Sequence, residues 1–300
     1  FMQTRQRLLC MAVSMALLLG GATLFTGCPV WWQPARTEVI TLFSGDAEPL
    51  MKQLLAAYKQ GQSEMAVEDI QSFTVTVTHI ELHRAAADEP GDGEQNQTGG
   101  EQDPADIVSV FDGSVDVELK SLTGVSEVLS AAEVPPGRYT QIRLAIENPR
   151  LVLTAAPGEV ETDIHLTAND QLFITEQFDV PENETSLLRL DFGGIHLVAQ
   201  GNGGYTLTPQ LRAELNVENA DVMLRGAVAD LDTDAALLLL TLSDGSQVEV
   251  DYATAQVYLP ADGDTPTGTE ADLALDQTLE VAGLINLQGL VTAQTISIQP

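Results

Sequence analysis

Residues 72–78 have the sequence SFTVTVT, and this stretch decides the class of the fold. Its apolar residues occupy the odd positions and its polar residues the even ones, which predicts a strand with one buried face. The next apolar residues, Ile80 and Leu82, occupy even positions instead. Because side chains alternate with a period of two along a strand, this change of phase predicts a β-bulge near Thr78 and His79.

Short segments of the same kind flank this strand, and turn-forming residues separate them. Many short strands joined by glycine- and proline-containing turns are typical of a sandwich or barrel. We therefore expect an antiparallel β-sandwich domain over residues 37–218. The further predicted strands are 38–43, 107–111, 114–119, 139–146, 150–153, 171–178, 186–191, 195–198 and 204–215. The predicted turns include Asp112-Gly113, Pro135-Pro136-Gly137, Asn148-Pro149, Pro157-Gly158 and Gly193-Gly194.

Residues 221–300 restart the alternation and are predicted to form a separate small domain. The dipeptide Asp244-Gly245 lies between two apolar segments, which is a hairpin signal. About five strands in so short a stretch favour a small β-barrel, since closure leaves no exposed edge strand. The predicted strands are 222–228, 237–242, 247–252, 254–259, 278–285 and 290–298.

Two segments of the first domain depart from the β pattern. Residues 46–60 are predicted to form an inserted helix, because apolar residues recur at helical spacing and Gly61 can end it. Residues 85–106 are predicted to be a disordered acidic loop, since they contain seven acidic side chains and no basic one. The expected fold class is therefore mainly β: an antiparallel β-sandwich with one inserted helix, followed by a small β-barrel-like domain.

The amino terminus carries an export signal. Arg5 and Arg7 precede a long apolar segment that ends in Leu24-Phe25-Thr26-Gly27-Cys28, which resembles a bacterial lipoprotein signal. We expect residues 1–27 to be a signal peptide, Cys28 to carry lipid, and residues 28–36 to form a tether. The alternative is an uncleaved membrane anchor, because the apolar segment reaches the lower limit for a spanning helix. The residue after Cys28 is not aspartate, so the outer membrane is the expected location.

The composition excludes several classes of partner and chemistry. The chain has 13 basic and 44 acidic side chains, a formal net charge of −31, which would repel the phosphates of a nucleic acid. Its hydrophobic content of 44% is sufficient for a packed core. Its two cysteines both lie within the first 28 residues, so a disulfide framework is not expected.

Motifs of nucleotide binding and nucleophilic catalysis are absent from the sequence. None of its three lysines follows a glycine, which excludes a P-loop. No Gly-x-Ser-x-Gly elbow or Ser-x-x-Lys motif occurs. We therefore expect no catalytic residues, no cofactor and no enzymatic activity.

A zinc site is one candidate that the sequence does contain. His79, Glu81 and His83 alternate along a strand, so three potential zinc ligands could share one face. The alternative is a solvated strand face, and we favour it because the predicted bulge would disturb the alignment. Arg138 and Arg143 are expected to pair with some of the abundant carboxylates.

A calcium site is the second candidate. Asp230, Asp232 and Asp234 begin like the loop of an EF-hand. Ala235 and Thr241 stand where that loop requires glycine and glutamate. A hairpin turn is therefore the favoured alternative, and no calcium is expected.

Four segments together resemble a family of bacterial lipoproteins known as domain of unknown function 4382, over about residues 37–217. They are Ile80-Glu81-Leu82-His83, residues 133–144 (EVPPGRYTQIRL), Leu190-Asp191-Phe192 and residues 205–211 (YTLTPQL). Residues 221–300 resemble another family, domain of unknown function 5666. The residues that carry this second resemblance are Gly226, Val228, Asp244-Gly245, Thr254, residues 279–283 (LEVAG), Ala293 and Ile296. The resemblances imply a location in the cell envelope and a β architecture, and neither implies an activity.

Three functions remain open at this point. The first is a non-enzymatic envelope lipoprotein, held to the membrane by its lipid, that acts as a structural or interaction module for another envelope protein or a polysaccharide. The second is a carbohydrate- or polymer-binding module of the adhesion type. The third is a metal-dependent enzyme at the face of His79, Glu81 and His83. Nucleic acid is not expected as a partner of any of them.

Overall fold

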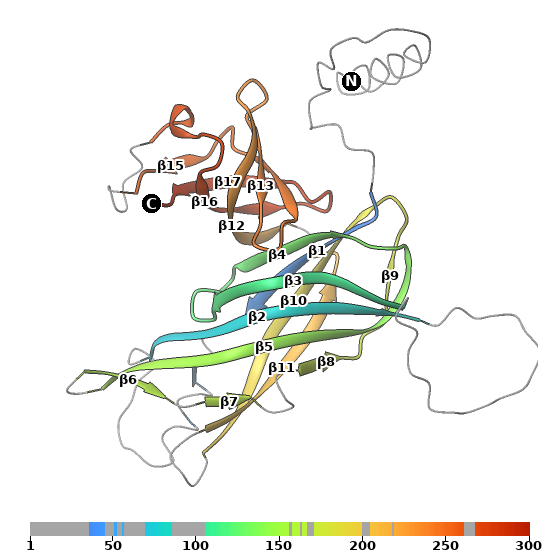
Figure 1. Ribbon diagram of the computed structural model, residues 1–300, viewed down its shortest axis with the longest axis vertical. Coiled ribbons are helices and arrows are strands. Elements are labelled where there is room, and N and C mark those ends of the chain that lie inside the picture. The colour runs from blue at the N-terminus through green and yellow to red at the C-terminus, as the bar shows by residue number, and fades with distance from the viewer. Residues whose placement is uncertain are drawn as a thin grey trace, which may run out of the picture. The chain divides into compact units, whose positions relative to one another are not determined.

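The residues described by a computed structural model form two β-sheets (Figure 1). The fold is mainly β, as the sequence predicts, with a sandwich-like part and a small closed barrel. Residues 37–300 belong to one compact unit. The structure describes residues 36–45, 51–52, 56, 70–85, 106–155, 158–162, 164–166, 171–199, 205–217, 219–260 and 268–300.

One layer of the sandwich is a six-stranded sheet in the order β3-β2-β5-β6, with β8 and β9 also paired to β5. In Figure 1, β3, β2 and β5 lie side by side as long ribbons. Its strands are β2 Ile70–Arg84, β3 Ile107–Glu118, β5 Gly137–Ala155, β6 Gly158–Thr162, β8 Gln171–Ile174 and β9 Phe178–Val180.

The opposing layer has the order β4-β1-β10-β11-β7. Its first pairing is antiparallel, whereas β1 and β10 run parallel. The strands are β1 Glu38–Gly45, β4 Ser126–Glu133, β7 Ile164–Leu166, β10 Thr185–Ala199 and β11 Tyr205–Leu215.

Strand β1 is buried on both of its faces. Val39 and Phe43 belong to the core between the two layers, where the rings of Phe43 and Phe192 lie 6.2 Å apart. Ile40 and Leu42 point to the opposite side and belong to a second apolar cluster. The alternation of side chains along one strand therefore supplies two cores.

The second cluster is centred on a closed barrel of five strands. Each neighbouring pair in the circuit β12-β13-β14-β17-β16-β12 is hydrogen-bonded, and β15 pairs with β17 outside it. This confirms the predicted barrel, and closure removes its edges. Its strands are β12 Ala220–Asp232, β13 Leu237–Thr241, β14 Gln247–Asp251, β15 Gln256–Tyr258, β16 Thr278–Ile285 and β17 Val291–Ile298.

The barrel and the sandwich are joined by a short seam. Strand β12 pairs in parallel with β4 through Val222 opposite Ser126 and Met223 opposite Glu127. Because of this pairing the sheet that contains β1 has eleven strands. The backbone N–H of Ala131 also donates to the hydroxyl of Ser246 in the β13–β14 turn, at 2.9 Å.

Three predicted turns are instead irregularities inside long strands. Asp112-Gly113 lies within β3, Asn148-Pro149 within β5 and Gly193-Gly194 within β10. Asn148 has a φ of 49°, and the register of β10 against β11 shifts between Phe192 and Gly194. A bulge uses the same residue types as a tight turn, so six of the predicted strands merge into β3, β5 and β10.

The bulge predicted near Thr78 is confirmed. The register of β2 shifts between Val77 and His79 against both of its neighbours. Strands β4, β6 and β7, in contrast, have no counterpart among the predicted strands.

Several expectations concern residues outside those described. Of the predicted helix 46–60, the structure describes Met51, Lys52 and Ala56 as helical, and the inserted helix as a whole stays a prediction. Nearly all of the acidic loop, the signal peptide and the tether also lie outside the described residues. Within the part of the chain that is described, no helix is long and apolar enough to cross a membrane.

Candidate functional site

The bulge in β2 sets the orientation of the candidate zinc ligands. After it, Ile80 and Leu82 enter the core, so His79, Glu81 and His83 lie on the outer face of the sheet. The three candidates therefore do share a face.

Neighbouring strands add charged groups to this face. Register places Arg143 of β5 opposite Glu81, and Asp112 of β3 opposite His79. The Nδ1 atom of His79 lies 3.7 Å from the carboxylate of Asp112, which is highly exposed.

The carboxylate of Glu81 is the centre of the cluster. Its Oε1 lies 3.0 Å from Nε2 of His79. Its Oε2 accepts a hydrogen bond from Nη1 of Arg143 at 3.4 Å and lies 3.7 Å from Nε2 of His83. Both carboxylate oxygens thus face nitrogen atoms, which offsets the cost of partly burying the charge.

Arg143 extends this cluster to an exposed aromatic ring. Its guanidinium also donates to the side chain of Gln171 and lies 5.8 Å from the ring centroid of Phe173, within cation–π range. Phe173 is 56% exposed although it is a large apolar residue. We call Glu81, Arg143, Gln171 and Phe173 the outer-face cluster.

This arrangement favours a hydrogen-bonded strand face over a zinc site. A guanidinium 3.4 Å from Glu81 would repel a metal cation bound to the same carboxylate. Among the residues described, no group of three or more His, Cys, Asp or Glu side chains is placed to hold a metal ion. The expected pairing of the two arginines is confirmed, since Arg138 also bonds Asp179 at 3.0 Å.

The candidate calcium ligands stabilise a turn. Oδ1 of Asp232 accepts the backbone N–H groups of Asp234 and Ala235, each at 3.0 Å, between β12 and β13. Asp230 accepts the N–H of Leu231 at 2.9 Å. An aspartate that bonds the backbone a few residues ahead is a common way to fix a turn. The geometry therefore favours the hairpin-turn interpretation.

The outward face of β14 is acidic. Burial raises the pKa of Glu249, and the neighbouring charge of Asp251 raises it further. Carboxylates at this place are unfavourable for a phosphate backbone.

Sequence reasoning missed Phe173 and its contact with Arg143. Phe173 lies within the predicted strand 171–178, on the same face as Gln171. This shared face is the sequence feature that could have placed Phe173 beside Gln171. Cys28, the candidate lipidation site, lies outside the described residues, so its modification stays a prediction.

Comparison with known proteins finds one family model that matches part of the chain. The sequence model of the family described as Domain of unknown function (DUF4382) matches residues 63–209. No curated protein and no solved structure matches the chain. The matched span contains the outer-face cluster and ends before the barrel.

Proposed function

We propose, from the premise that residues 63–209 form a domain of the DUF4382 family, that this protein is a lipid-anchored, non-enzymatic interaction module of the bacterial cell envelope. The lipoprotein-like signal that ends at Cys28 supports export and anchoring, with the outer membrane as the destination. The partner is another envelope protein, bound through the outer-face cluster.

The observation that carries this proposal is the pair formed by Arg143 and Phe173. Arginine and aromatic residues are enriched at the centres of protein interfaces, where they contribute much of the binding free energy. Arg143 is held by Glu81 and Gln171, so it loses little side-chain freedom when a partner binds. Phe173 offers an exposed ring beside a positioned cation.

The same contacts argue against catalysis at this face. A general base must be able to reach a substrate proton, and the Glu81 carboxylate is already engaged by Arg143 and His79. The net charge of −31 argues against nucleic acid as the partner.

A photo-crosslinking experiment tests the proposed surface. A photoreactive phenylalanine analogue replaces Phe173 in the full chain, and the matched control carries it at Leu275. These two side chains are similarly exposed, at 56% and 58%, and Leu275 lies in the barrel part. We expect a discrete crosslinked species in intact envelopes from position 173, absent from position 275. Equal patterns at the two positions would remove the support for this surface.

The anchor requires its own test. The variant Cys28→Ala should lose incorporation of labelled fatty acid and leave the membrane fraction, or accumulate as uncut precursor. A wild-type chain that incorporates no labelled fatty acid would contradict the lipoprotein assignment.

The alternative function, a carbohydrate- or polymer-binding module, is favoured by a different observation. It concerns a hollow in the barrel part, outside the span of the family match.

A further inference from the structure

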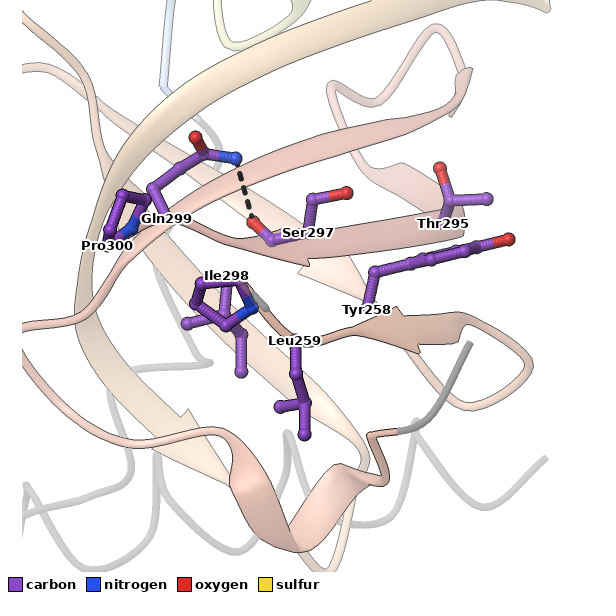
Figure 2. Close-up of a pocket in the computed structure, with 8 residues that line it drawn as sticks. Tyr258, Leu259, Thr295, Ser297, Ile298, Gln299 and Pro300 are labelled. Carbon is purple, nitrogen blue, oxygen red and sulfur yellow. Dashed lines mark hydrogen bonds between the residues drawn. The ribbon is translucent and has the colours of Figure 1, made fainter. Parts of the chain in front are cut away.

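We propose that a hollow beside β15 and β17 of the barrel is a binding site for an uncharged carbohydrate. This inference goes beyond the interaction module proposed above and depends neither on the lipid anchor nor on the outer-face cluster. Eight residues line the hollow: Tyr258, Leu259, Pro260, Thr295, Ser297, Ile298, Gln299 and Pro300 (Figure 2).

Strand pairing brings the polar residues of this site together. Strand β15 runs parallel to β17, with Gln256 opposite Thr295 and Tyr258 opposite Ser297. Alternate residues of β17 point to one face, so Thr295, Ser297 and Gln299 form a polar row beside the tyrosine.

Tyr258 supplies an aromatic surface. Its hydroxyl donates to Oε1 of Gln256 at 3.2 Å, which fixes the direction of the side chain. The ring lies next to Thr295 in Figure 2. The negative face of an aromatic ring attracts the weakly positive C–H groups of a sugar ring, and tyrosine loses little rotational freedom on binding.

The polar row matches the chemistry of a polyol. Each hydroxyl of Thr295 and Ser297 can both donate and accept a hydrogen bond, as can each hydroxyl of a sugar. The side-chain amide of Gln299 donates to the backbone carbonyl of Ser297 at 3.4 Å (Figure 2).

Two apolar residues of the lining are anchored in the barrel core. Ile298 is 8% exposed and belongs to the core of the barrel, and Leu259 packs against that core. The hollow has a volume of about 480 Å³, within the range of small-molecule sites. The accessible lining of the hollow is mostly polar, which suits a ligand rich in hydroxyl groups.

Charge selects the kind of carbohydrate. None of the side chains that line the hollow is charged at neutral pH, while the whole chain carries −31. An anionic sugar would meet the repulsion of the chain without a cation to bind it. A neutral carbohydrate avoids this cost.

Ligand-detected saturation-transfer NMR on the full chain tests the proposal. The neutral probes are maltotriose, cellotriose and diacetylchitobiose, and trigalacturonic acid is the anionic comparison. We expect saturation transfer to at least one neutral probe and none to the anionic one. Tyr258→Ala should weaken that binding roughly tenfold, and Tyr258→Phe should retain it.

Matched threonine variants locate the site. Thr295→Val should weaken binding several-fold, since it removes one hydroxyl from the polar row. Thr292→Val changes an exposed threonine of the same strand outside the hollow and should leave binding unchanged. Unaltered melting temperatures would show that the variants fold.

Three results would overturn the proposal. They are the absence of saturation transfer to every neutral probe at about 1 mM, binding that Tyr258→Ala leaves unchanged, and a preference for trigalacturonic acid.

Discussion

The sandwich and the barrel differ in how each completes its core. The core between the two sandwich layers is built from residues that precede the barrel in the chain. The barrel core also contains Ile40, Leu42 and Leu187, which belong to sandwich strands. The sequence pattern sets the barrel apart from the sandwich. The barrel nevertheless depends on sandwich strands to bury part of its apolar surface.

The largest effect that tests this dependence comes from two adjacent residues of β1. Leu42→Ala removes a fully buried side chain from the barrel core, and Phe43→Ala removes one from the sandwich core. Each should lower the free energy of unfolding by about 3 kcal/mol or more. Hydrogen exchange should show lost protection in β12 and β16 for Leu42→Ala, and in β2 and β5 for Phe43→Ala.

The test depends on which amides lose protection, rather than on how far the free energy of unfolding falls. If both variants loosened the same amides, the two cores would behave as one. If Leu42→Ala left the barrel amides protected, the barrel would not depend on β1.

A second prediction concerns glycines that permit close approach of strands. A Cβ atom at Gly283 would lie 2.2 Å from the carbonyl oxygen of Thr292, which is backbone and cannot rotate away. Gly283→Ala should therefore lower the free energy of unfolding by about 2 kcal/mol. Gly45→Ala in the sandwich is the matched control, because its Cβ would meet nothing closer than 3.6 Å.

Thermal or urea unfolding of the two glycine variants measures this contrast. The expected result is a large loss for the barrel variant and a change within about 0.5 kcal/mol for the sandwich variant. Equal losses would mean that close strand approach does not distinguish the barrel from the sandwich.

The third prediction concerns Glu127, at the seam between the two regions. Burial raises the pKa of this carboxyl from 4.5 to about 7, while Arg225 lowers it and Glu280 raises it. The folded chain therefore holds a proton that the unfolded chain releases. Stability that depends on this group is fully present below pH 4.5 and is lost as the pH rises toward 7.

Glu127→Gln should remove this pH dependence, because glutamine stays neutral. We expect the variant to be more stable than the wild type above pH 7 by roughly 1 to 2 kcal/mol, since the group keeps some contact with water, and no more stable at pH 4. Glu182→Gln, which changes an exposed carboxylate before β10, is the control. A wild-type profile that does not fall between pH 4.5 and 7 would contradict the raised pKa.

The smallest predicted effect concerns the β12–β13 turn. Asp232→Ala removes the acceptor of two backbone N–H groups and should cost about 1 kcal/mol. Calcium at micromolar concentration and constant ionic strength should shift the melting temperature of neither protein. A calcium-specific rise that Asp232→Ala abolishes would establish the site that the turn geometry disfavours.

The sequence predicts the β class, the closed barrel and the bulge of β2, because each follows from local alternation. It does not predict β4, whose serines, alanines and apolar residues are mostly buried without a period-two pattern. Burial on both faces erases that pattern, so its position depends on β1 and β12. Glycine, asparagine and proline mark departures from regular strand geometry, but whether the chain reverses depends on strands distant in sequence.

The candidate sites, too, can be predicted from the sequence only where local spacing determines them. A shared face for His79, Glu81 and His83 follows from their spacing. The approach of Arg143 to Glu81 requires the register between β2 and β5, and the exposure of Phe173 requires the position of β8. The place of Tyr258 beside the hollow requires the pairing of β15 with β17.

The place of β1 also determines how the fold carries mechanical load. Any tension on the chain before Thr37 enters the fold through β1, which is hydrogen-bonded on one side to β4 and on the other to β10. A pull along the strand loads these two ladders in shear, so many hydrogen bonds must break together rather than one after another. With the proposed tether at its amino terminus, the protein would hold its attachment by a strand buried on both faces, and the loss of that strand would open both cores at once.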